Sequence, residues 1–342
     1  MILFLLYIHV YTKHRHSIDF FIRPLSDTVE CAELTSRDES TLVARAFVPG
    51  HITGVFRIYD DSADPLLRGS TGAGFCVKIG TITTVRVKDH STLKVSTRYN
   101  GTRIDAQVTS TVVRLLAEEC GRTIRVDVDH ESSLPSGVGF GASGAGALGT
   151  AIALGHILDE DLAFSTIASF AHEAEVLNHT GLGDVIAQTK GGTEMRVRAG
   201  APHIGALIGF PYDEDVTVVL AGAPGLQTRE VLTDPESRRR INEIGTVLVD
   251  RLEQNPSFDT FIECSREFSD AIDLKTPRVR KALGELENNG LVQSSMVMLG
   301  DSVFCFCNST QVEDTRSILS KYWAQPEIFV TGIEERGGRL MT

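Results

Sequence analysis

The sequence lacks the features that mark several common classes of protein. It has six cysteines in 342 residues and no Cys-x-x-Cys pair, so a zinc site would have too few closely spaced ligands. Isolated thiols are typical of buried positions in a reducing cytoplasm. Lys and Arg number 33 against 45 Asp and Glu, and the net charge of −12 repels nucleic-acid phosphates. We therefore expect a cytoplasmic protein with no nucleic acid as partner.

The N-terminal apolar run is too short for a membrane span. Residues 1–10 are apolar, whereas a spanning helix needs about 20 such residues. The positive charges follow this run at positions 13–16, whereas a signal peptide carries them first. Residues 17–42 show no period. We expect residues 1–42 to be a weakly ordered extension, or the product of a start codon assigned too far upstream. A peripheral membrane anchor is the alternative.

From Val43 onward the apolar residues follow regular periods, and no internal repeat is visible. Alternation predicts strands at 43–57, 75–87 with a break at Gly80, 93–96, 123–128, 193–197, 216–220, 302–307 and 327–330. Helical spacing predicts helices at 105–119, 147–158, 162–177, 235–252, 258–273, 278–288 and 312–322. This mixture indicates an α+β protein, and the turn-forming residues 221–225 place a domain boundary near residue 222.

A glycine-rich segment precedes the helix expected from residue 147. It reads Pro-Ser-Gly-Val-Gly-Phe-Gly-Ala-Ser-Gly-Ala at 135–145. Alternate glycines let a backbone turn tightly and expose its N–H groups, and a helix N-terminus attracts anions. The segment therefore predicts a phosphate-binding loop, in which the Ser143 hydroxyl suits Mg²⁺ or a phosphate oxygen.

Three other kinds of loop compete with this interpretation. A Walker loop would need a lysine before its Ser or Thr, and none is present. The spacing Gly139-x-Gly141-x-x-Gly144 matches a dinucleotide-binding fingerprint, but residues 129–136 separate it from the preceding strand. A tightly packed turn without a ligand is the third alternative.

The next helix and the turn after it carry a second group of polar residues. His172 and Glu175 are three positions apart and so share one helix face. Gly181 is expected to end the helix and to leave Asp184 on a turn that points back at the loop. His172, Glu175 and His179 would also suit a zinc or iron ion, an alternative that leaves the glycine loop unexplained.

The loop resembles the second signature of the GHMP kinases, whose usual form is Pro-x-Gly-x-Gly-Leu-Gly-Ser-Ser-Ala. Here Phe140, Ala142 and Gly144 replace the Leu, the first Ser and the final Ala. Any metal contact of the loop therefore falls to Ser143. The third signature of the family, normally a glycine cluster, is reduced to Gly300.

The resemblance implies a fold, two cofactors and a set of site residues. The fold is that of a GHMP kinase, with a ribosomal protein S5 domain 2-like N-terminal domain at 43–222 and a ferredoxin-like C-terminal domain at 223–342. The cofactors are ATP and Mg²⁺. The metal ligands would be Ser143 and Glu175, and Asp184 would orient or deprotonate the acceptor hydroxyl. The loop residues expected to bind ATP are Pro135, Gly137, Gly139, Gly141, Ala142, Ser143, Gly144 and Ala145.

Further stretches resemble archaeal pantoate kinases, which make 4-phosphopantoate on the route to coenzyme A. They read Phe-Val-Pro-Gly-His-Ile-Thr-Gly at 47–54, Gly-Ser-Thr-Gly-Ala-Gly at 69–74 and Thr-Gly-Leu-Gly-Asp at 180–184. The resemblance implies ATP and pantoate as substrates. It allows a homodimer. A GHMP kinase for homoserine, mevalonate or shikimate is one alternative, and a non-catalytic metabolite sensor is another.

Pantoate carries a carboxylate, so a cation is expected to meet it. Arg196, on the strand after the aspartate, is the candidate, and Arg198 on the same strand face is its rival. The resemblance also implies that Ser70, His172 and Thr228 hydrogen-bond the oxygens of the substrate.

Overall fold

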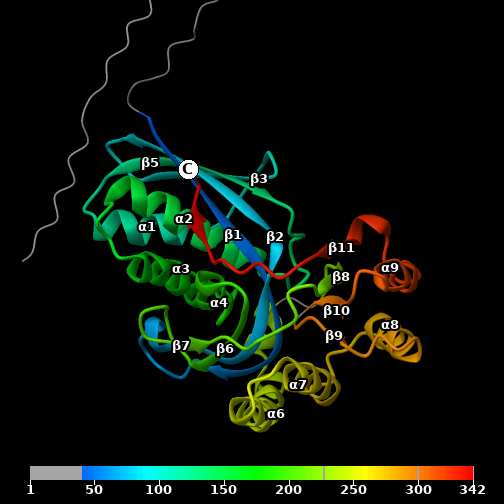
Figure 1. Ribbon diagram of the computed structural model, residues 1–342. Helices are drawn as coiled ribbons and strands as arrows, with labels where there is room; N and C mark the ends of the chain where they lie inside the picture. The colour runs from blue at the N-terminus through cyan, green and yellow to red at the C-terminus, as the bar shows by residue number, and fades with distance from the viewer. Residues whose placement is uncertain (1–40, 226–227, 299, 342) are drawn as a thin grey trace, which may run out of the picture. The chain divides into compact units, whose positions relative to one another are not determined.

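Two long antiparallel strands, β1 (Leu42–Tyr59) and β2 (Gly69–Asp89), form the centre of the fold. The computed structural model describes residues 41–225, 228–298 and 300–341 (Figure 1). The expectation for residues 1–42 thus falls almost entirely outside the described residues. The break expected at Gly80 is absent from β2, because a register shift between Pro49 and Gly50 lies opposite it and lets both strands bend without ending.

The two long strands belong to an eight-stranded sheet with the order β12-β1-β2-β5-β3-β4, in which β6 pairs with the first part of β2 and β7 pairs with β6. Its other strands are β3 (Lys94–Tyr99), β4 (Thr102–Ile104), β5 (Ile124–Ser132), β6 (Thr193–Arg198), β7 (Ala206–Ile208) and β12 (Arg339–Leu340). A short turn of 3-10 helix, Pro65–Leu67, joins β1 to β2.

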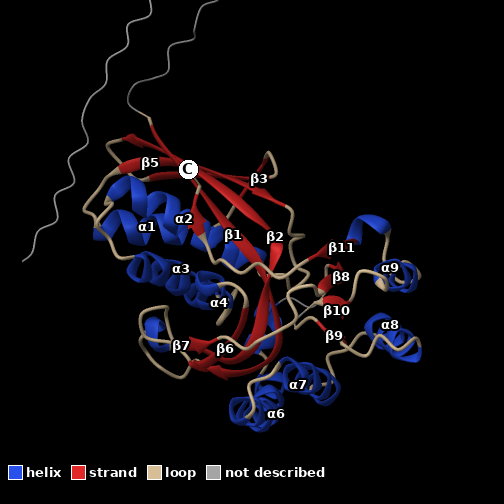
Figure 2. Cartoon of the chain, in the orientation of Figure 1, coloured by secondary structure: helices blue, strands red, loops and turns tan. Residues whose placement is uncertain are grey.

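Helices cover one face of this sheet (Figure 2). They are α1 (Gln107–Glu119), α2 (Ala142–Leu158), α3 (Phe164–Asn178) and α4 (Asp184–Lys190). Helix α2 packs on both β1 and β2, and its small residues are buried from Gly144 to Gly155. The helix begins at Ala142 and not at residue 147 as expected, so the last part of the glycine-rich segment forms its first turn.

A second sheet is built from four antiparallel strands in the order β11-β8-β10-β9. Its strands are β8 (Thr217–Ala223), β9 (Ser294–Met296), β10 (Asp301–Cys307) and β11 (Ile328–Thr331). The accompanying helices are α5 (Thr228–Thr233), α6 (Pro235–Gln254), α7 (Phe258–Ala271), α8 (Pro277–Asn288) and α9 (Val312–Leu319), with a 3-10 turn at Gln325–Glu327. The chain enters this sheet at Thr217, before the boundary expected near residue 222, and its last strand, β12, returns to the first sheet.

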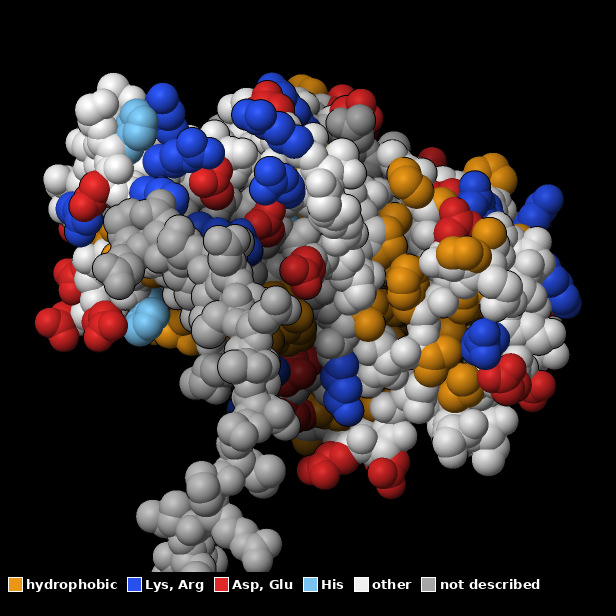
Figure 3. Space-filling model, turned by 90° about the horizontal axis from the view of Figure 1, so that it is seen from above, with side chains coloured by type: hydrophobic (Ala, Val, Ile, Leu, Met, Phe, Trp, Pro, Cys, Tyr) orange, Lys and Arg blue, Asp and Glu red, His pale blue; other side chains and the backbone are white. Residues whose placement is uncertain are grey.

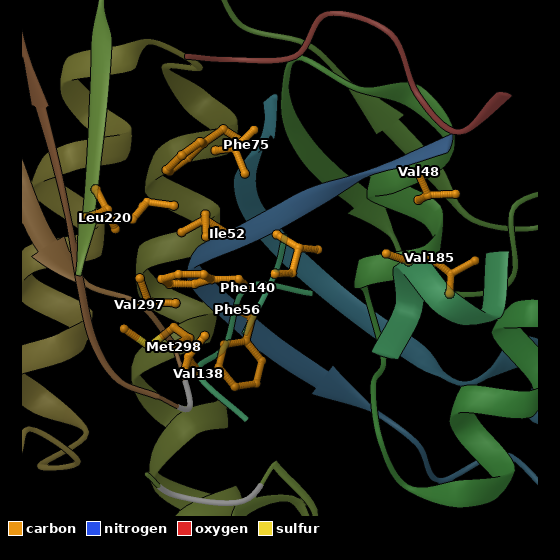
Figure 4. Close-up of a cluster of buried hydrophobic side chains, with 14 of the residues drawn as sticks. Val48, Ile52, Phe56, Phe75, Val138, Phe140, Val185, Leu220, Val297 and Met298 are labelled. Atoms are coloured by element: carbon orange, nitrogen blue, oxygen red, sulfur yellow. The ribbon is translucent and has the colours of Figure 1, made fainter. Parts of the chain in front are cut away.

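Apolar side chains from the glycine-rich segment and from both sheets meet in one cluster (Figure 4). Phe75 of β2 stacks edge-on against Phe304 of β10, with ring centroids 5.4 Å apart. Phe140 of the glycine-rich segment meets Phe329 of β11 at 6.0 Å. Because a close-packed core resists displacement, this cluster fixes the segment against both sheets.

On the face seen from above, acidic and basic side chains are interspersed, and hydrophobic side chains gather on the right half of the view, with charged side chains among them (Figure 3). Among the helices of the described ranges, none combines the length and the apolarity needed to cross a bilayer.

Candidate active site

A cavity of about 740 Å³ opens beside the N-terminus of α2. The glycine-rich segment, the start of α4 and the middle of β6 contribute to its wall. The predicted site residues that line it are Ser70, Pro135, Gly137, Gly139, Gly141, Ala142, Ser143, Asp184 and Arg196. Gly144 and Ala145 belong to the same helix turn but are buried within it.

The glycine-rich segment alternates between residues that turn the backbone and residues that anchor it. Val138 and Phe140 are buried in the apolar cluster. The backbone turns at three residues with left-handed φ angles, Gly137 (77°), Gly139 (83°) and Gly141 (69°). Such angles favour glycine. The segment therefore delivers the chain to Ala142, where the first N–H groups of α2 have no carbonyl partner within the helix and can bind an anion.

Gly300 completes the packing of this segment. A Cβ on Gly139 would lie 2.8 Å from the carbonyl oxygen of Met298, and a Cβ on Gly300 would collide with the carbonyl of Val138. The turn after β9 thus needs a glycine where it meets the glycine-rich segment. A single glycine serves here where the family pattern normally has a glycine cluster.

Glu175 of α3 reaches the first turn of α2. Its Oε1 accepts hydrogen bonds from the hydroxyls of Ser143 at 2.5 Å and Thr180 at 2.9 Å. Its Oε2 is buried without a hydrogen-bond partner among the described residues and packs on Gly181, against which Asp184 also lies. Burial raises the pKa of Glu175 to about 7. The hydrogen bond from Ser143 lowers this pKa, and the charge of Asp184 raises it.

This arrangement fits a divalent cation. A buried carboxylate oxygen without a partner costs free energy, and a cation beside Ser143 and Glu175 would remove that cost. The alternative zinc or iron site is not formed: the described residues contain no group of three His, Cys, Asp or Glu placed to hold a metal. His172 instead hydrogen-bonds the carbonyl of Arg68 through Nε2 at 2.9 Å.

Asp184 lies at the cavity wall with 28% of its side chain exposed. It is the first residue of α4 and not a turn residue. Helix α3 ends at Asn178, before the expected Gly181, and its C-cap His179 has a left-handed φ of 56°. A carboxylate is favourable at a helix N-terminus. Oδ1 contacts His51 Nδ1 at 2.7 Å, and none of the described residues hydrogen-bonds Oδ2, so this oxygen is available to a ligand.

Arg196 is 1% exposed and still borders the cavity. Its Nη1 donates to Glu194, and its Nε has no partner among the described residues. Gly183 brings Arg196 and Ser70 together, because a Cβ there would lie 2.5 Å from Ser70 Oγ and 2.8 Å from Arg196 Nε. The predicted pair of Ser70 and Arg196 therefore shares one wall with Asp184.

The remaining predicted substrate residues are placed differently. Arg198 does not line the cavity, because a register shift between Arg196 and Arg198 interrupts the alternation of β6, and Arg198 Nε donates to the carbonyl of Ile204. His172 is buried away from the cavity wall, and burial lowers its pKa to about 4. Thr228 begins α5, and its side chain lies outside the described residues.

Sequence reasoning assigned no role to three residues that organise the site, namely His51, Glu194 and Gln188. His51 is buried between Asp184 and Glu194, with Nε2 3.0 Å from Glu194 Oε1. Gln188 Nε2 donates to the carbonyls of Pro49 and Gly141, both at 2.9 Å. The only signal for His51 was its place in the Pro-Gly-His-Ile-Thr-Gly stretch, since each partner is far away in the sequence.

The charge state of His51 follows from its surroundings. Burial alone lowers the pKa of the ring. The hydrogen bonds with Asp184 and Glu194 and the charges of these two carboxylates outweigh burial, so the pKa is raised.

Comparison with known proteins gives consistent results. A sequence model of the GHMP kinases N terminal domain matches residues 107–192, and one of the GHMP kinases C terminal domain matches residues 249–325. The chain is 33% identical over 288 residues to a pantoate kinase of Thermococcus kodakarensis, covering 82% of this chain and 92% of that protein. It is 31% identical over 274 residues to a pantoate kinase of Methanocaldococcus jannaschii, covering 80% and 96%.

Solved structures show the same architecture. One described as a phosphotransferase related to the CoA biosynthesis pathway superposes with a TM-score of 0.78 at 28% identity, covering 88% of this chain and 99% of that chain. Mevalonate diphosphate decarboxylase from Staphylococcus aureus superposes with a TM-score of 0.70 at 13% identity, covering 89% and 99%. The second likeness shows the fold alone.

Proposed function

The chain belongs to the GHMP kinases and, within them, to the pantoate kinases, and we propose that it transfers the γ-phosphoryl group of ATP to the 4-hydroxyl of pantoate. The expected α+β GHMP kinase fold is confirmed. The observation that carries the assignment of the site is one cavity wall that combines the N-terminus of a helix, a carboxylate and a buried arginine.

The proposed reaction uses these groups in distinct roles. The oxygen of the pantoate hydroxyl attacks the γ-phosphorus, the bond to the β,γ-bridging oxygen breaks, and ADP leaves. Asp184 accepts the hydroxyl proton through the oxygen that His51 does not hold. Phosphoryl transfer depends chiefly on positioning and on charge neutralisation, which the N–H groups at the start of α2 would supply to the phosphates.

Two further residues would complete the substrate and metal sites. Arg196 would bind the carboxylate of pantoate, and its Nε, which has no partner among the described residues, supports that role. Ser143 and Glu175 would hold Mg²⁺, whose positive charge offsets the negative charge of the phosphates when it is bound. The Glu175 oxygen that lacks a partner within the described ranges supports this assignment.

A substrate panel tests the proposal. ADP release is measured with Mg-ATP and each of pantoate, homoserine, mevalonate and shikimate. We expect pantoate to give the highest kcat/KM and its 4-phosphate as product. A higher kcat/KM with another acceptor would identify that acceptor as the substrate in place of pantoate. No ADP release with any acceptor would favour a nucleotide-binding sensor.

We expect Glu175→Gln to weaken Mg²⁺-dependent turnover more than Glu173→Gln. Both residues lie on α3, but only Glu175 is buried against Ser143, whereas Glu173 is partly exposed. Mg²⁺ uses few protein ligands, so the loss of one matters. The Mg²⁺ concentration for half-maximal rate and kcat are measured for both variants. A larger defect in Glu173→Gln would show that the wrong carboxylate has been assigned to the metal.

We expect a chain that starts at Thr41 to fold and to keep the kcat of the full chain. Strand β1 begins at Leu42, and every residue of the proposed site follows it. Soluble yield, thermal unfolding temperature and kcat are compared for the two chains. A loss of solubility or of turnover in the shortened chain would assign a role to residues 1–40.

The proposal extends to the location and the assembly of the protein. The five cysteines among the described residues are free thiols, which supports a reducing cytoplasm. Strand β11 is an edge strand of the second sheet and exposes Val330, which supports contact with a second copy. Light scattering of the purified protein tests the homodimer.

A further inference from the structure

His51 lies between two carboxylates that come from different elements. It is on β1, at 0% exposure, and its ring nitrogens contact Asp184 of α4 at 2.7 Å and Glu194 of β6 at 3.0 Å. Glu194 Oε1 also accepts from Arg196 Nη1. The four side chains thus form one continuous row from the carboxylate at the cavity wall to the buried guanidinium.

The proton count of this row indicates the charge of the ring. A neutral imidazole has one N–H group and one lone pair, so one of its two contacts would place a lone pair against a carboxylate oxygen. An imidazolium donates to both oxygens. It also balances the row, because the two carboxylates then face two cations, His51 and Arg196, in a buried region where an unpaired charge is costly.

The sheet is built to accommodate the row. Strand β2 runs between β1 and β6, with Cys76 opposite His51 and Gly74 opposite Glu194. A Cβ on Gly74 would lie 2.7 Å from His51 Nε2 and 3.1 Å from Glu194 Oε1. His51 and Glu194 therefore meet across the central strand only because position 74 has no side chain.

We propose that His51, as an imidazolium, is the positioning residue of this site: it holds Asp184 toward the acceptor hydroxyl and, through Glu194, holds Arg196 toward the acceptor carboxylate. The roles of Asp184 and Arg196 rest on the proposed function. The geometry of the row itself does not, so the charge of His51 can be measured without any substrate.

The first test reads the protonation of His51 in the full-length protein labelled with ¹⁵N-histidine. We expect both ring nitrogens of His51 to carry a proton at pH 7, with His51→Gln identifying the signal. His130 is an internal comparison, because it is also buried but bonds only the hydroxyls of Thr83 and Thr109, and burial lowers its pKa to about 4. A neutral His51 ring at pH 7 would overturn the proposal.

The second test separates the contact of His51 with Asp184 from its contact with Glu194 by means of a matched pair of variants. In His51→Asn the amide can reach the position of Nδ1 and keep the bond to Asp184, and in His51→Gln it can reach the position of Nε2 and keep the bond to Glu194. A hydrogen bond to a charged group corresponds to about a 10- to 100-fold effect. We expect His51→Asn mainly to raise KM for pantoate and His51→Gln mainly to lower kcat, each by about this factor, with KM for ATP unchanged.

A purely structural role predicts another pattern. Both variants would then lower the melting temperature and the fraction of active enzyme, and KM for pantoate would stay the same in both. Equal effects of the two variants on kcat and KM would therefore overturn the proposal. If the wild-type enzyme does not phosphorylate pantoate, the proposed function fails, while the ¹⁵N measurement still decides the charge of the row.

Discussion

Asp184→Asn is expected to lower kcat by about 10²–10⁴-fold, the usual contribution of general acid–base catalysis, while ATP binding survives. The amide oxygen of an asparagine can still accept the hydrogen bond that His51 now gives to Oδ1, so the fold of the site should persist. The amide nitrogen cannot accept the proton of the acceptor hydroxyl. Because the proposed function assigns Asp184 to the acceptor and not to ATP, the dissociation constant of a non-hydrolysable ATP analogue should change little.

The measurement pairs kcat with the affinity of that analogue by calorimetry. Asp105→Asn is the matched control, because Asp105 lines the same cavity but hydrogen-bonds only the side chain of Gln107 among the described residues. We expect Asp105→Asn to stay within about threefold of the wild-type kcat. If Asp184→Asn also stays within that range, its carboxylate has no part in proton transfer.

Arg196→Ala is expected to raise KM for pantoate, by the factor that corresponds to a loss of roughly 2–3 kcal/mol of charge-assisted bonding. The negative charges of Asp184 and of the ATP phosphates would otherwise repel a carboxylate that enters the cavity. Arg196→Lys keeps the charge but loses the planar fork that pairs with a carboxylate through two parallel bonds, so its KM for pantoate should rise less. KM for ATP should stay similar in both variants.

Arg196→Ala also removes the guanidinium that pairs with Glu194 beside His51, so its thermal stability must be measured beside its kinetics. Arg198→Ala is the control, since Arg198 is exposed on the same strand and bonds a backbone carbonyl outside the cavity. An unchanged KM for pantoate in Arg196→Ala would remove this residue from the substrate site. Equal turnover of an acceptor that lacks a carboxylate would remove the reason for a cation there.

Many elements of the fold could be predicted because their signals are local. Apolar residues alternate with polar ones in strands and recur at helical spacing in helices, because one face of each element is buried. This pattern gave the correct type for elements such as α1 and β10. Local signals failed at Gly80, where the strand continues because the opposite strand shifts its register at the same place. They also failed at Ala142, where packing against α4 and β1 allows the helix to begin early.

The sequence by itself determined the kind of site. Glycines that alternate with buried apolar residues can turn and anchor a backbone at once, and this local pattern is sufficient to indicate a phosphate-binding loop before a helix. The helix and the turn between Glu175 and Asp184 fix their separation, whereas the resemblance to the GHMP kinases implied their place beside the loop. The prediction of the loop needs only residues that are near one another in the chain.

Only the tertiary structure decided how the site is held together. His51 is 133 positions from Asp184 and 143 positions from Glu194, and no local pattern relates residues so far apart. Their meeting depends on the register of β1 and β6 against β2 and on the missing side chain at Gly74. The structure also separated Arg196 from Arg198, because one shift of register in β6 changes which side chain reaches the cavity.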